Sequence, residues 1–228
     1  MSIKADCHLH SSFSGDSKAP MPEMIDKGIS LGLETMCFTE HNDFDYPNTE
    51  EGPGSIFLLN TYLYDILRCR AKYEGKMRVL FGVELGLQPH LADRDEDFTS
   101  AYDFDFVIGS THLCRGMDPY YPEYFEKFSS EEEAIRAYFA ETLENLKCHD
   151  DYDVLGHLDY IVRVAPSKDK NYSYDKCHRS DSGTVGSQWQ GPGIEYRKLP
   201  LWSQTASSLY RCSPPLSRTG RRDHYRWQ

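Results

Sequence analysis

The sequence lacks the features that mark exported or membrane-spanning chains. Its seven cysteines are scattered singly, with no CxxC pair, which fits reduced thiols better than a disulfide framework or a structural zinc site. No apolar run approaches the roughly 20 residues that a membrane-spanning helix needs. The opening residues, MSIKAD, do not begin an apolar export segment. We therefore expect a soluble, cytoplasmic protein.

Positive charge is also scarce. The 228 residues contain 25 Lys and Arg against 36 Asp and Glu, for a formal net charge of -11. Proteins that bind nucleic acids neutralise phosphates with clustered Lys and Arg, so we expect no nucleic-acid partner, and we expect no membrane partner either. With 39% hydrophobic and 27% charged residues, the composition is globular, and the length is enough for one substantial domain.

The distribution of charge divides the chain into two parts. Residues 1–177 hold 17 basic against 33 acidic side chains, whereas residues 178–228 hold 8 against 3. The second part has no clear strand and no convincing amphipathic helix, and it is dominated by Ser, Arg, Pro and Gly, a composition typical of disordered segments. We therefore expect one domain over residues 1–177 and an atypical tail over residues 178–228.

The first part alternates between short apolar runs and longer amphipathic segments. Short apolar runs that end in polar residues predict strands at 3–10, 34–41, 77–86, 104–113 and 152–159. Helical spacing of apolar residues, together with Pro, Ser or acidic residues at the start, predicts helices at 22–33, 55–75 and 129–147. Alternating strands and helices predict a parallel α/β fold.

Polar side chains stand at the C-terminal ends of the predicted strands. In a β/α barrel these ends converge on one face, where barrel enzymes keep their active sites. The side chains in question are His8, His10, Glu40, His41, Glu84, His112 and His157. Five strand ends are therefore expected to meet in one pocket.

The opening pair alone is a weak signal for metal binding. His8 and His10 are two residues apart on a predicted strand, so both side chains point to the same side. Two solvated histidines, or two histidines with partners in the core, would explain this HxH pattern as well. The nearby carboxylate of Asp16 adds only a little weight.

The other strand ends favour a metal site much more strongly. Glu84 follows an apolar run, where a lone buried carboxylate is costly unless it is paired or bound to metal. Imidazoles mixed with carboxylates suit zinc, iron or manganese rather than calcium. We expect a multinuclear centre in which Glu84 bridges two ions, and such a centre is suited to hydrolysing a phosphoester.

These motifs resemble those of the PHP (polymerase and histidinol phosphatase) superfamily. The likeness covers roughly residues 3–176 and rests on HLH, TEH, GVELG, STH and GHLD, and the segments FSGDS, FTEHNDFD and GHLDYIVR are most similar to the histidinol-phosphatase branch. The resemblance implies a distorted (β/α)7 TIM-like barrel with three divalent metal ions, Zn, Mn or Fe. It also implies a small phosphorylated substrate: L-histidinol phosphate, hydrolysed to L-histidinol and phosphate in histidine biosynthesis.

The resemblance further implies a role for individual side chains. The implied metal ligands form three sets, one for each ion. The first set is His8, His10 and the bridging Glu84; the second is His112, His157 and the same Glu84; and the third is Asp16 and His41. Arg163 is the candidate for gripping phosphate oxygens with its guanidinium fork, and a plain surface arginine is the alternative. Glu40 is expected to orient its neighbours rather than bind metal. His90 either lines the substrate pocket or is a solvated loop residue.

One part of the family pattern is missing from the sequence. The remaining family ligands, an Asp and a His in a GSDAH-type motif on the last strand, do not occur. The degeneracy of the genetic code allows residues 188–228, read one base later, to encode a strand, an amphipathic helix and a second strand. We therefore interpret the chain as frameshifted or truncated after about residue 177, with the last barrel strands missing or replaced by an irregular tail. A genuine lineage-specific tail is the alternative.

Three functions follow from these patterns. The leading one is metal-dependent histidinol-phosphatase activity. One alternative is another PHP phosphoesterase that acts on a different small phosphomonoester or on a nucleotide end. The other is a non-catalytic product, either a pseudoenzyme that binds metal or an inactive frameshifted fragment. Metal content and phosphatase activity separate these functions, because a pseudoenzyme holds ions without turnover and a misfolded fragment does neither. The oligomeric state cannot be read from the sequence.

Overall fold

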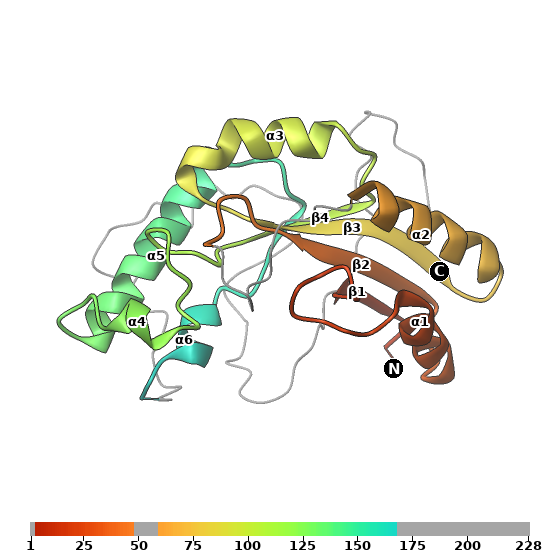
Figure 1. The fold of residues 1–228 in the computed structure, drawn as a ribbon, viewed down its shortest axis with the longest axis horizontal. Coiled ribbons are helices and arrows are strands. Elements are labelled where there is room, and N and C mark those ends of the chain that lie inside the picture. Colours follow the sequence, from red (N-terminus) through yellow and green to blue (C-terminus); the bar gives the residue numbers. More distant parts are fainter. Residues whose placement is uncertain (1–2, 48–58, 168–228) are drawn as a thin grey trace.

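The computed structural model describes residues 3–47 and 59–167 (Figure 1). The expected domain boundary at residue 177 and the expected tail over residues 178–228 lie outside these described residues, as does the start of the helix expected at 55–75. Within the described part, strands and helices alternate along the chain. The prediction of an α/β fold is therefore confirmed.

A curled sheet of five parallel strands forms the centre of this part (Figure 1). The strands are β1 (Ala5–Leu9), β2 (Thr35–Asn42), β3 (Arg78–Gly86), β4 (Phe106–Ser110) and β5 (Val154–Leu155). Their order in the sheet is their order in the chain, as in a β/α barrel, where each βα unit adds its strand beside the previous one. The seven strands of the expected barrel cannot be counted within the described residues.

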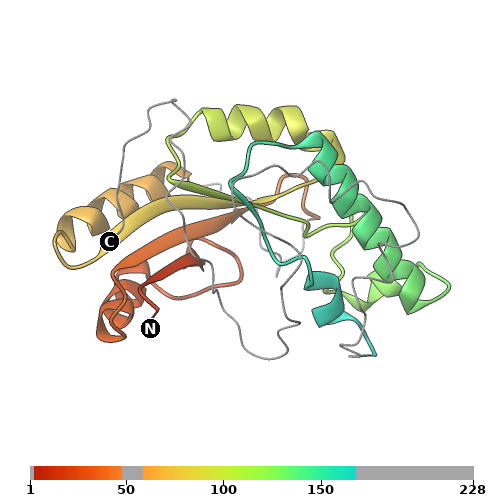
Figure 2. The same cartoon turned by 180° about the vertical axis from the view of Figure 1, so that it is seen from behind.

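Helices lie at both ends of the sheet. They are α1 (Met21–Ser30), α2 (Leu59–Lys72), α3 (Ala92–Ser100), α4 (Pro122–Phe125), α5 (Glu131–Cys148) and α6 (Tyr160–Val164), with a 3-10 turn η1 (Pro89–Leu91) before α3. Both views place α1 and α2 together at one end and α4, α5 and α6 together at the other (Figures 1 and 2). In the described residues no helix is long and apolar enough to cross a membrane.

Local sequence signals explain where the long helices begin. In α1, Pro22 occupies the first turn, where its missing N–H costs nothing, and Gly32 follows the helix with a positive φ of 82°. In α5, the Ser130 hydroxyl accepts a hydrogen bond from the Glu133 N–H at 3.2 Å. Three acidic residues in the first turn of α5 also complement the helix dipole.

The core is built on β2 and β3, whose side chains are almost all buried. Tyr62 of α2 is fully buried, and its hydroxyl lies 2.8 Å from the carbonyl oxygen of Phe38 and 2.9 Å from that of Gly82. These carbonyls belong to β2 and β3, so one phenol ties α2 to both central strands. The central strands carry the site residues, and this packing fixes their position.

Some elements differ from the sequence-based expectations. Helix α3 was not predicted, because ADRDEDFTS has no apolar periodicity and the residues that it buries are Asp95 and Thr99. Strand β5 has only two residues, whereas the apolar run suggested a strand over 152–159. Strand β4 ends at Ser110, so His112 lies in the segment that follows it.

Candidate metal centre

The predicted metal ligands gather at the C-terminal edge of the sheet, where the ends of parallel strands meet. Three of them lie within strands and four follow a strand, in chain order His8, His10, Asp16, His41, Glu84, His112 and His157. The structure brings all seven into one connected cluster. Residues from five βα units thus meet at one point.

Glu84 is the centre of this cluster. Its side chain is fully buried, with 0% exposure. The parallel register pairs Glu84 with His41 of β2 and with Ile108 of β4, which fixes its height on the sheet. Its two carboxylate oxygens face different groups of imidazoles.

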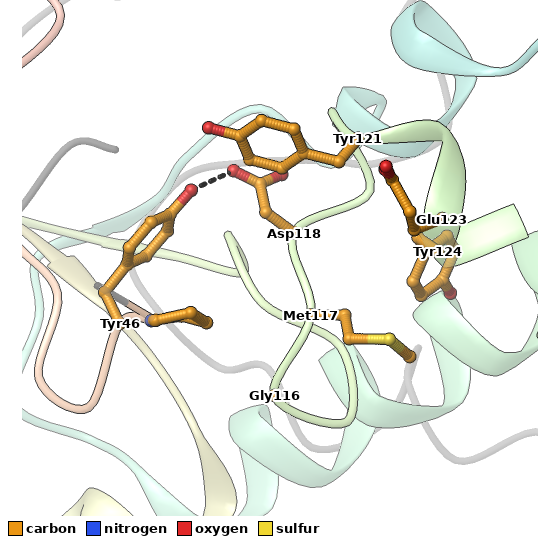
Figure 3. Close-up of a pocket in the computed structure, with 8 residues that line it drawn as sticks. Tyr46, Gly116, Met117, Asp118, Tyr121, Glu123 and Tyr124 are labelled. Atoms are coloured by element: carbon orange, nitrogen blue, oxygen red, sulfur yellow. Dashed lines mark hydrogen bonds between the residues drawn. The ribbon is translucent and has the colours of Figure 1, made fainter. Parts of the chain in front are cut away.

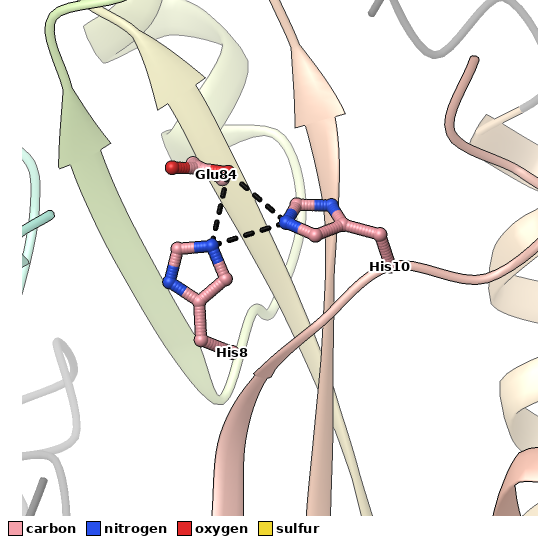
Figure 4. A group of neighbouring side chains, drawn as sticks. All are labelled: His8, His10 and Glu84. Atoms are coloured by element: carbon pink, nitrogen blue, oxygen red, sulfur yellow. Dashed lines mark hydrogen bonds and ion pairs between the residues drawn. The ribbon is translucent and has the colours of Figure 1, made fainter. Parts of the chain in front are cut away.

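The Oε2 atom of Glu84 faces the two histidines of the HxH motif (Figure 4). It lies 3.2 Å from Nε2 of His8 and 3.3 Å from Nε2 of His10, and these two nitrogens lie 3.0 Å apart. Ligand atoms around a tetrahedral zinc ion are also about 3.3 Å apart, because each lies about 2.0–2.1 Å from the metal. The triangle therefore has the dimensions of one face of such a tetrahedron.

A second observation supports a cation at this position. Among the described residues, no hydrogen-bond donor is aligned with Oε2 of Glu84, although Nδ1 of His41 lies 3.4 Å away. A buried carboxylate oxygen without a hydrogen bond is costly. A metal ion between this oxygen and the imidazole nitrogens removes that cost, so the donor set fits a metal.

The Oε1 atom of Glu84 faces a different group of side chains. It lies 2.8 Å from Nε2 of His157 and 3.2 Å from Nε2 of His112, and it accepts a hydrogen bond from the Ser110 hydroxyl at 2.6 Å. A Cβ atom at Gly156 would approach the Ser110 Oγ to 2.1 Å. The absence of a side chain at Gly156 therefore leaves room for the hydroxyl that orients Glu84.

His41 extends the cluster towards the loop between β1 and α1. Its Nε2 atom lies 3.5 Å from Oδ2 of Asp16, and its ring stacks on the ring of His10 with centroids 4.2 Å apart. Asp16 is half exposed, unlike Glu84. This corner of the cluster is therefore its most accessible part.

Asp43 also belongs to the cluster and was missed by the sequence analysis. It is 2% exposed, its Oδ1 lies 2.6 Å from Nδ1 of His112, and its Oδ2 lies 3.4 Å from Nδ1 of His41. The signal was present in the sequence, because His41 and Asp43 have the same i, i+2 spacing as His8 and His10. The contact with His112, however, comes only from the folded sheet.

Four groups of three side chains in this cluster could each hold a metal ion, with ligand atoms within 4.8 Å of one another. Neighbouring groups share members. The groups are His8, His10 and Glu84; His10, Asp16 and His41; His41, Asp43 and His112; and Glu84, His112 and His157. The three sets that the family resemblance implies lie within three of these groups.

For Glu84, His112 and His41, neighbouring charges outweigh the effect of burial, whereas burial lowers the pKa of His157 despite the opposing effect of Glu84. Burial alone raises the pKa of Glu84, but His112 and then His41 hold that pKa well below its usual range. Burial lowers the pKa of His112, yet Asp43 and Glu84 raise it well above its ordinary value. Against the same effect of burial, Glu84 and then Asp16 raise the pKa of His41 to about 10. The buried carboxylates are thus anionic and attract positive charge.

Among the described residues, Glu40 is in none of the four groups that could hold a metal ion. It is fully buried and accepts hydrogen bonds from the Ser11 backbone N–H, the Ser11 hydroxyl and the Ser14 hydroxyl, at 2.6 to 3.1 Å. Oγ of Ser14 in turn lies 3.3 Å from Nδ1 of His10. Glu40 thus holds the loop that carries His10, as expected for a residue that orients its neighbours.

Two other predicted site residues lie at the edge of the fold. Arg163 lies on α6, and its Nη2 is 2.5 Å from Oδ1 of Asp159. His90 lies in η1, and its Nε2 is 3.1 Å from Oδ2 of Asp45. Both side chains are more than half exposed. Neither is among the side chains that contact Glu84.

Comparison with known proteins gives consistent results. The family model described as "PHP domain" matches residues 6–180. The chain is 34% identical over 173 residues to "Histidinol-phosphatase" of Lactococcus lactis subsp. lactis (strain IL1403), covering 75% of this chain and 62% of the relative. It is 35% identical over 171 residues to "Probable histidinol-phosphatase" of Clostridium acetobutylicum, covering 75% of this chain and 63% of the relative.

A solved structure is similar as well. The crystal structure of histidinol phosphate phosphatase from Lactococcus lactis subsp. lactis Il1403, complexed with Zn, L-histidinol and phosphate, superimposes with a TM-score of 0.65. The two chains are 32% identical, and the match covers 72% of this chain and 60% of the other. The chain therefore spans less than two thirds of the length of the relatives that it matches.

Proposed function

Because the chain belongs to the PHP domain family, we propose that it is a metal-dependent phosphomonoester hydrolase that acts on L-histidinol phosphate. The observation that carries this proposal is the buried carboxylate of Glu84, whose two oxygens both face imidazole nitrogens. The names of the similar proteins support the choice of substrate. The products are L-histidinol and phosphate.

We propose three metal ions, zinc, manganese or iron, held by the sets that the family resemblance implies. His8 and His10 hold the first ion with Glu84. The distances between their two Nε2 atoms and Oε2 of Glu84 support this set, because they match one face of a tetrahedron of zinc ligands. The second set is Glu84 with His112 and His157, and the third is Asp16 with His41, all within groups that could hold metal. Bound divalent cations polarise phosphoryl oxygens and lower the pKa of water.

Charge, burial and hydrogen bonding fix the state of the side chains around the proposed ions. Glu84 is anionic because the surrounding histidines stabilise its charge, and burial keeps the carboxylate from being solvated by bulk water. Ser110 fixes the orientation of Oε1 of Glu84. The half-exposed Asp16 lies on the open side of the cluster, where a small phosphomonoester has access. The substrate therefore approaches from the side of the loop between β1 and α1.

We propose that Arg163 supplies a further cation for the phosphate. Its position on α6 supports this role, because α6 begins three residues after the candidate ligand His157. The ion pair of Arg163 with Asp159 is more than half exposed, and such exposed pairs contribute little stability. The guanidinium can exchange this partner for a phosphate at small cost.

We further propose that residues 1–177 form the phosphoesterase unit and that residues 178–228 are an out-of-frame tail. The family match, which ends at residue 180, supports this division. The coverage of about three fifths of the relatives' length supports it too. A chain without the family's last-strand ligands can bind metal and still be inactive, so activity and metal content need separate measurements.

Phosphate release tests the proposed function. The chain is purified beside a version with the reading frame restored after Cys177, both are loaded with manganese or zinc, and release from histidinol phosphate is measured. We expect activity in the restored chain and its loss in Glu84→Gln of that chain. Hydrolysis of other phosphomonoesters but not of histidinol phosphate would favour another PHP phosphoesterase. Metal binding without hydrolysis in both chains would identify a non-catalytic protein.

A further inference from the structure

A small cavity next to the metal cluster contains a buried carboxylate that has no cationic partner among the residues that the structure describes. The cavity has a volume of about 140 Å³, and three of the residues that line it are the tyrosines Tyr46, Tyr121 and Tyr124 (Figure 3). Asp118 lines it as well and is only 8% exposed. An acidic group in an aromatic cavity does not suit an anion, so the phosphate itself is not the ligand of this cavity.

Within the described part of the chain, Asp118 accepts hydrogen bonds from neutral donors only. Its Oδ2 accepts from the Tyr46 hydroxyl at 2.6 Å, and its Oδ1 accepts from the Tyr160 hydroxyl at 2.7 Å and from the Tyr120 N–H at 2.8 Å. No Lys, Arg or His within residues 3–47 and 59–167 forms an ion pair with it. A carboxylate has about four acceptor positions, so one remains, on Oδ2. Buried charges are normally paired, which points to an external cation.

Asp118 is separated from the metal cluster by a single tyrosine ring. The ring of Tyr160, whose hydroxyl binds Asp118, lies 5.5 Å from the ring of His157 and 6.2 Å from that of His112. On the other side, Tyr46 follows His41 by five residues and reaches the same carboxylate. Tyr160 thus connects Asp118 to two of the candidate metal ligands, which places this carboxylate beside the cluster.

We propose that Asp118, with the aromatic rings of Tyr46 and Tyr121, binds the ammonium group of an amino-alcohol leaving group. A carboxylate supplies a charge-assisted hydrogen bond to an ammonium, and aromatic faces attract the same cation. Histidinol is such an amino alcohol, with its amine close to the esterified oxygen. This inference rests on the proposed function and adds the side chain that distinguishes a cationic substrate from a neutral phosphomonoester.

Binding of the product alone tests this inference without requiring catalysis. The affinity of the full chain for L-histidinol is compared with its affinity for the same imidazolyl alcohol lacking the amine, by isothermal titration calorimetry. We expect the amine to improve affinity about tenfold in the unmodified chain. In Asp118→Asn, which keeps the size and acceptor atom but removes the charge, the preference should fall to about twofold or less.

Three matched variants make the test specific. Glu126→Gln removes an exposed carboxylate outside the cavity and should keep the tenfold preference. Glu123→Gln removes an exposed carboxylate at the cavity itself, and loss of the preference in this variant instead of in Asp118→Asn would overturn the inference. If Asp118→Asn does not fold, Tyr121→Ala replaces it, because this change leaves all three hydrogen bonds of Asp118 intact and should still weaken L-histidinol binding about threefold.

Phosphate release by the chain with the reading frame restored after Cys177, in which we expect activity, separates failure of this inference from failure of the proposed function. Equal binding of the two alcohols by the unmodified chain, together with hydrolysis of histidinol phosphate, would overturn the role of Asp118 alone. A clear preference for the amine without any hydrolysis would support the role of Asp118 and contradict the proposed activity. A KM for histidinol phosphate that rises in Asp118→Asn, with unchanged hydrolysis of p-nitrophenyl phosphate, would support both.

Discussion

Oδ1 of Asp43 lies 2.6 Å from Nδ1 of His112, and this contact determines which nitrogen of His112 faces Glu84. An ionised carboxylate only accepts hydrogen bonds, so Nδ1 of His112 carries the donated proton. Nε2 of the same ring lies 3.2 Å from Oε1 of Glu84. Carboxylates that hold a ligating imidazole in this way set its tautomer and raise its basicity.

Replacing Asp43 should weaken metal binding. We expect Asp43→Ala to lower the affinity for zinc by about 10- to 100-fold, because His112 loses its orienting partner. Competition with a chromophoric chelator measures this affinity. Asp45→Ala is the matched control, because Asp45 is only two residues away but contacts His90 and Arg94 at the surface. Equal affinities for Asp43→Ala and the unmodified chain would show that Asp43 does not orient His112.

A methyl group added at position 86 should also disturb the contact between Asp43 and His112. A Cβ atom at Gly86 would approach Oδ1 of Asp43 to 1.9 Å and its Cγ to 2.7 Å. We therefore expect Gly86→Ala to rotate Asp43 away from His112 and to lower zinc affinity in the manner of Asp43→Ala. The double variant should be no weaker than Asp43→Ala alone. Additive losses would mean that the two changes act independently.

Substitution of Glu84 should remove more metal from the protein than substitution of Asp16. Glu84 belongs to two groups, one at each of its carboxylate oxygens, so Glu84→Gln should remove the metal of two groups. Asp16 belongs to one group, so Asp16→Asn should remove the ion of that group alone. Metal content per chain, measured by inductively coupled plasma mass spectrometry after dialysis, distinguishes the two. The same loss in both variants would contradict the bridging role of Glu84.

Asp95 should make stability depend on pH. Burial raises the pKa of Asp95 from its ordinary 3.8 to about 7. The positive charge of Arg94 opposes this shift, and the negative charges of Asp43 and Asp151 add to it. Between these values the folded chain keeps a proton that the unfolded chain releases. The contribution of Asp95 is therefore fully present below about pH 4, and it is lost as pH rises through about 7.

Asp95→Asn should remove this dependence. Between pH 5 and pH 8, we expect the Tm of Asp95→Asn to fall by at least about 3 °C less than the Tm of the unmodified chain. A free-energy difference of ~1 kcal/mol changes the Tm of a chain of this size by this amount. Thermal unfolding followed by circular dichroism measures it. The control is Asp97→Asn, an exposed carboxylate on the same helix. Parallel pH curves for the unmodified chain and Asp95→Asn would contradict this prediction.

The sequence predicted the parts of the fold that depend on apolar patterning. Strands β2 and β3 are buried on both faces, so they appear as continuous apolar runs whose polar ends carry His41 and Glu84. Helix α3 was not predicted, because it buries Asp95 and Thr99 instead of apolar residues. Oδ2 of Asp95 lies 3.5 Å from Nδ1 of His149, and this contact arises only once the chain has folded.

Part of the candidate site could also be predicted, because its residues follow apolar strands. Strand ends converge in any parallel sheet, so the histidines and Glu84 could be grouped without a structure. Asp43 and Asp118 could not be placed in this way, because each acts through a partner distant in sequence, His112 and Tyr46 respectively. Such pairs depend on the register of the sheet and on the path of the loops.

His8 and His157 both contact Glu84, although they lie near opposite ends of the described chain. One cation held by His8 and Glu84 and a second held by Glu84 and His157 would together be noncovalent cross-links that close a very long loop. Such a loop is entropically costly to close and is reached late in folding. A polypeptide that has not yet paired β5 with β4 cannot bring His157 to Glu84, so the group of Glu84, His112 and His157 would be able to bind a metal ion only after β5 has joined the sheet.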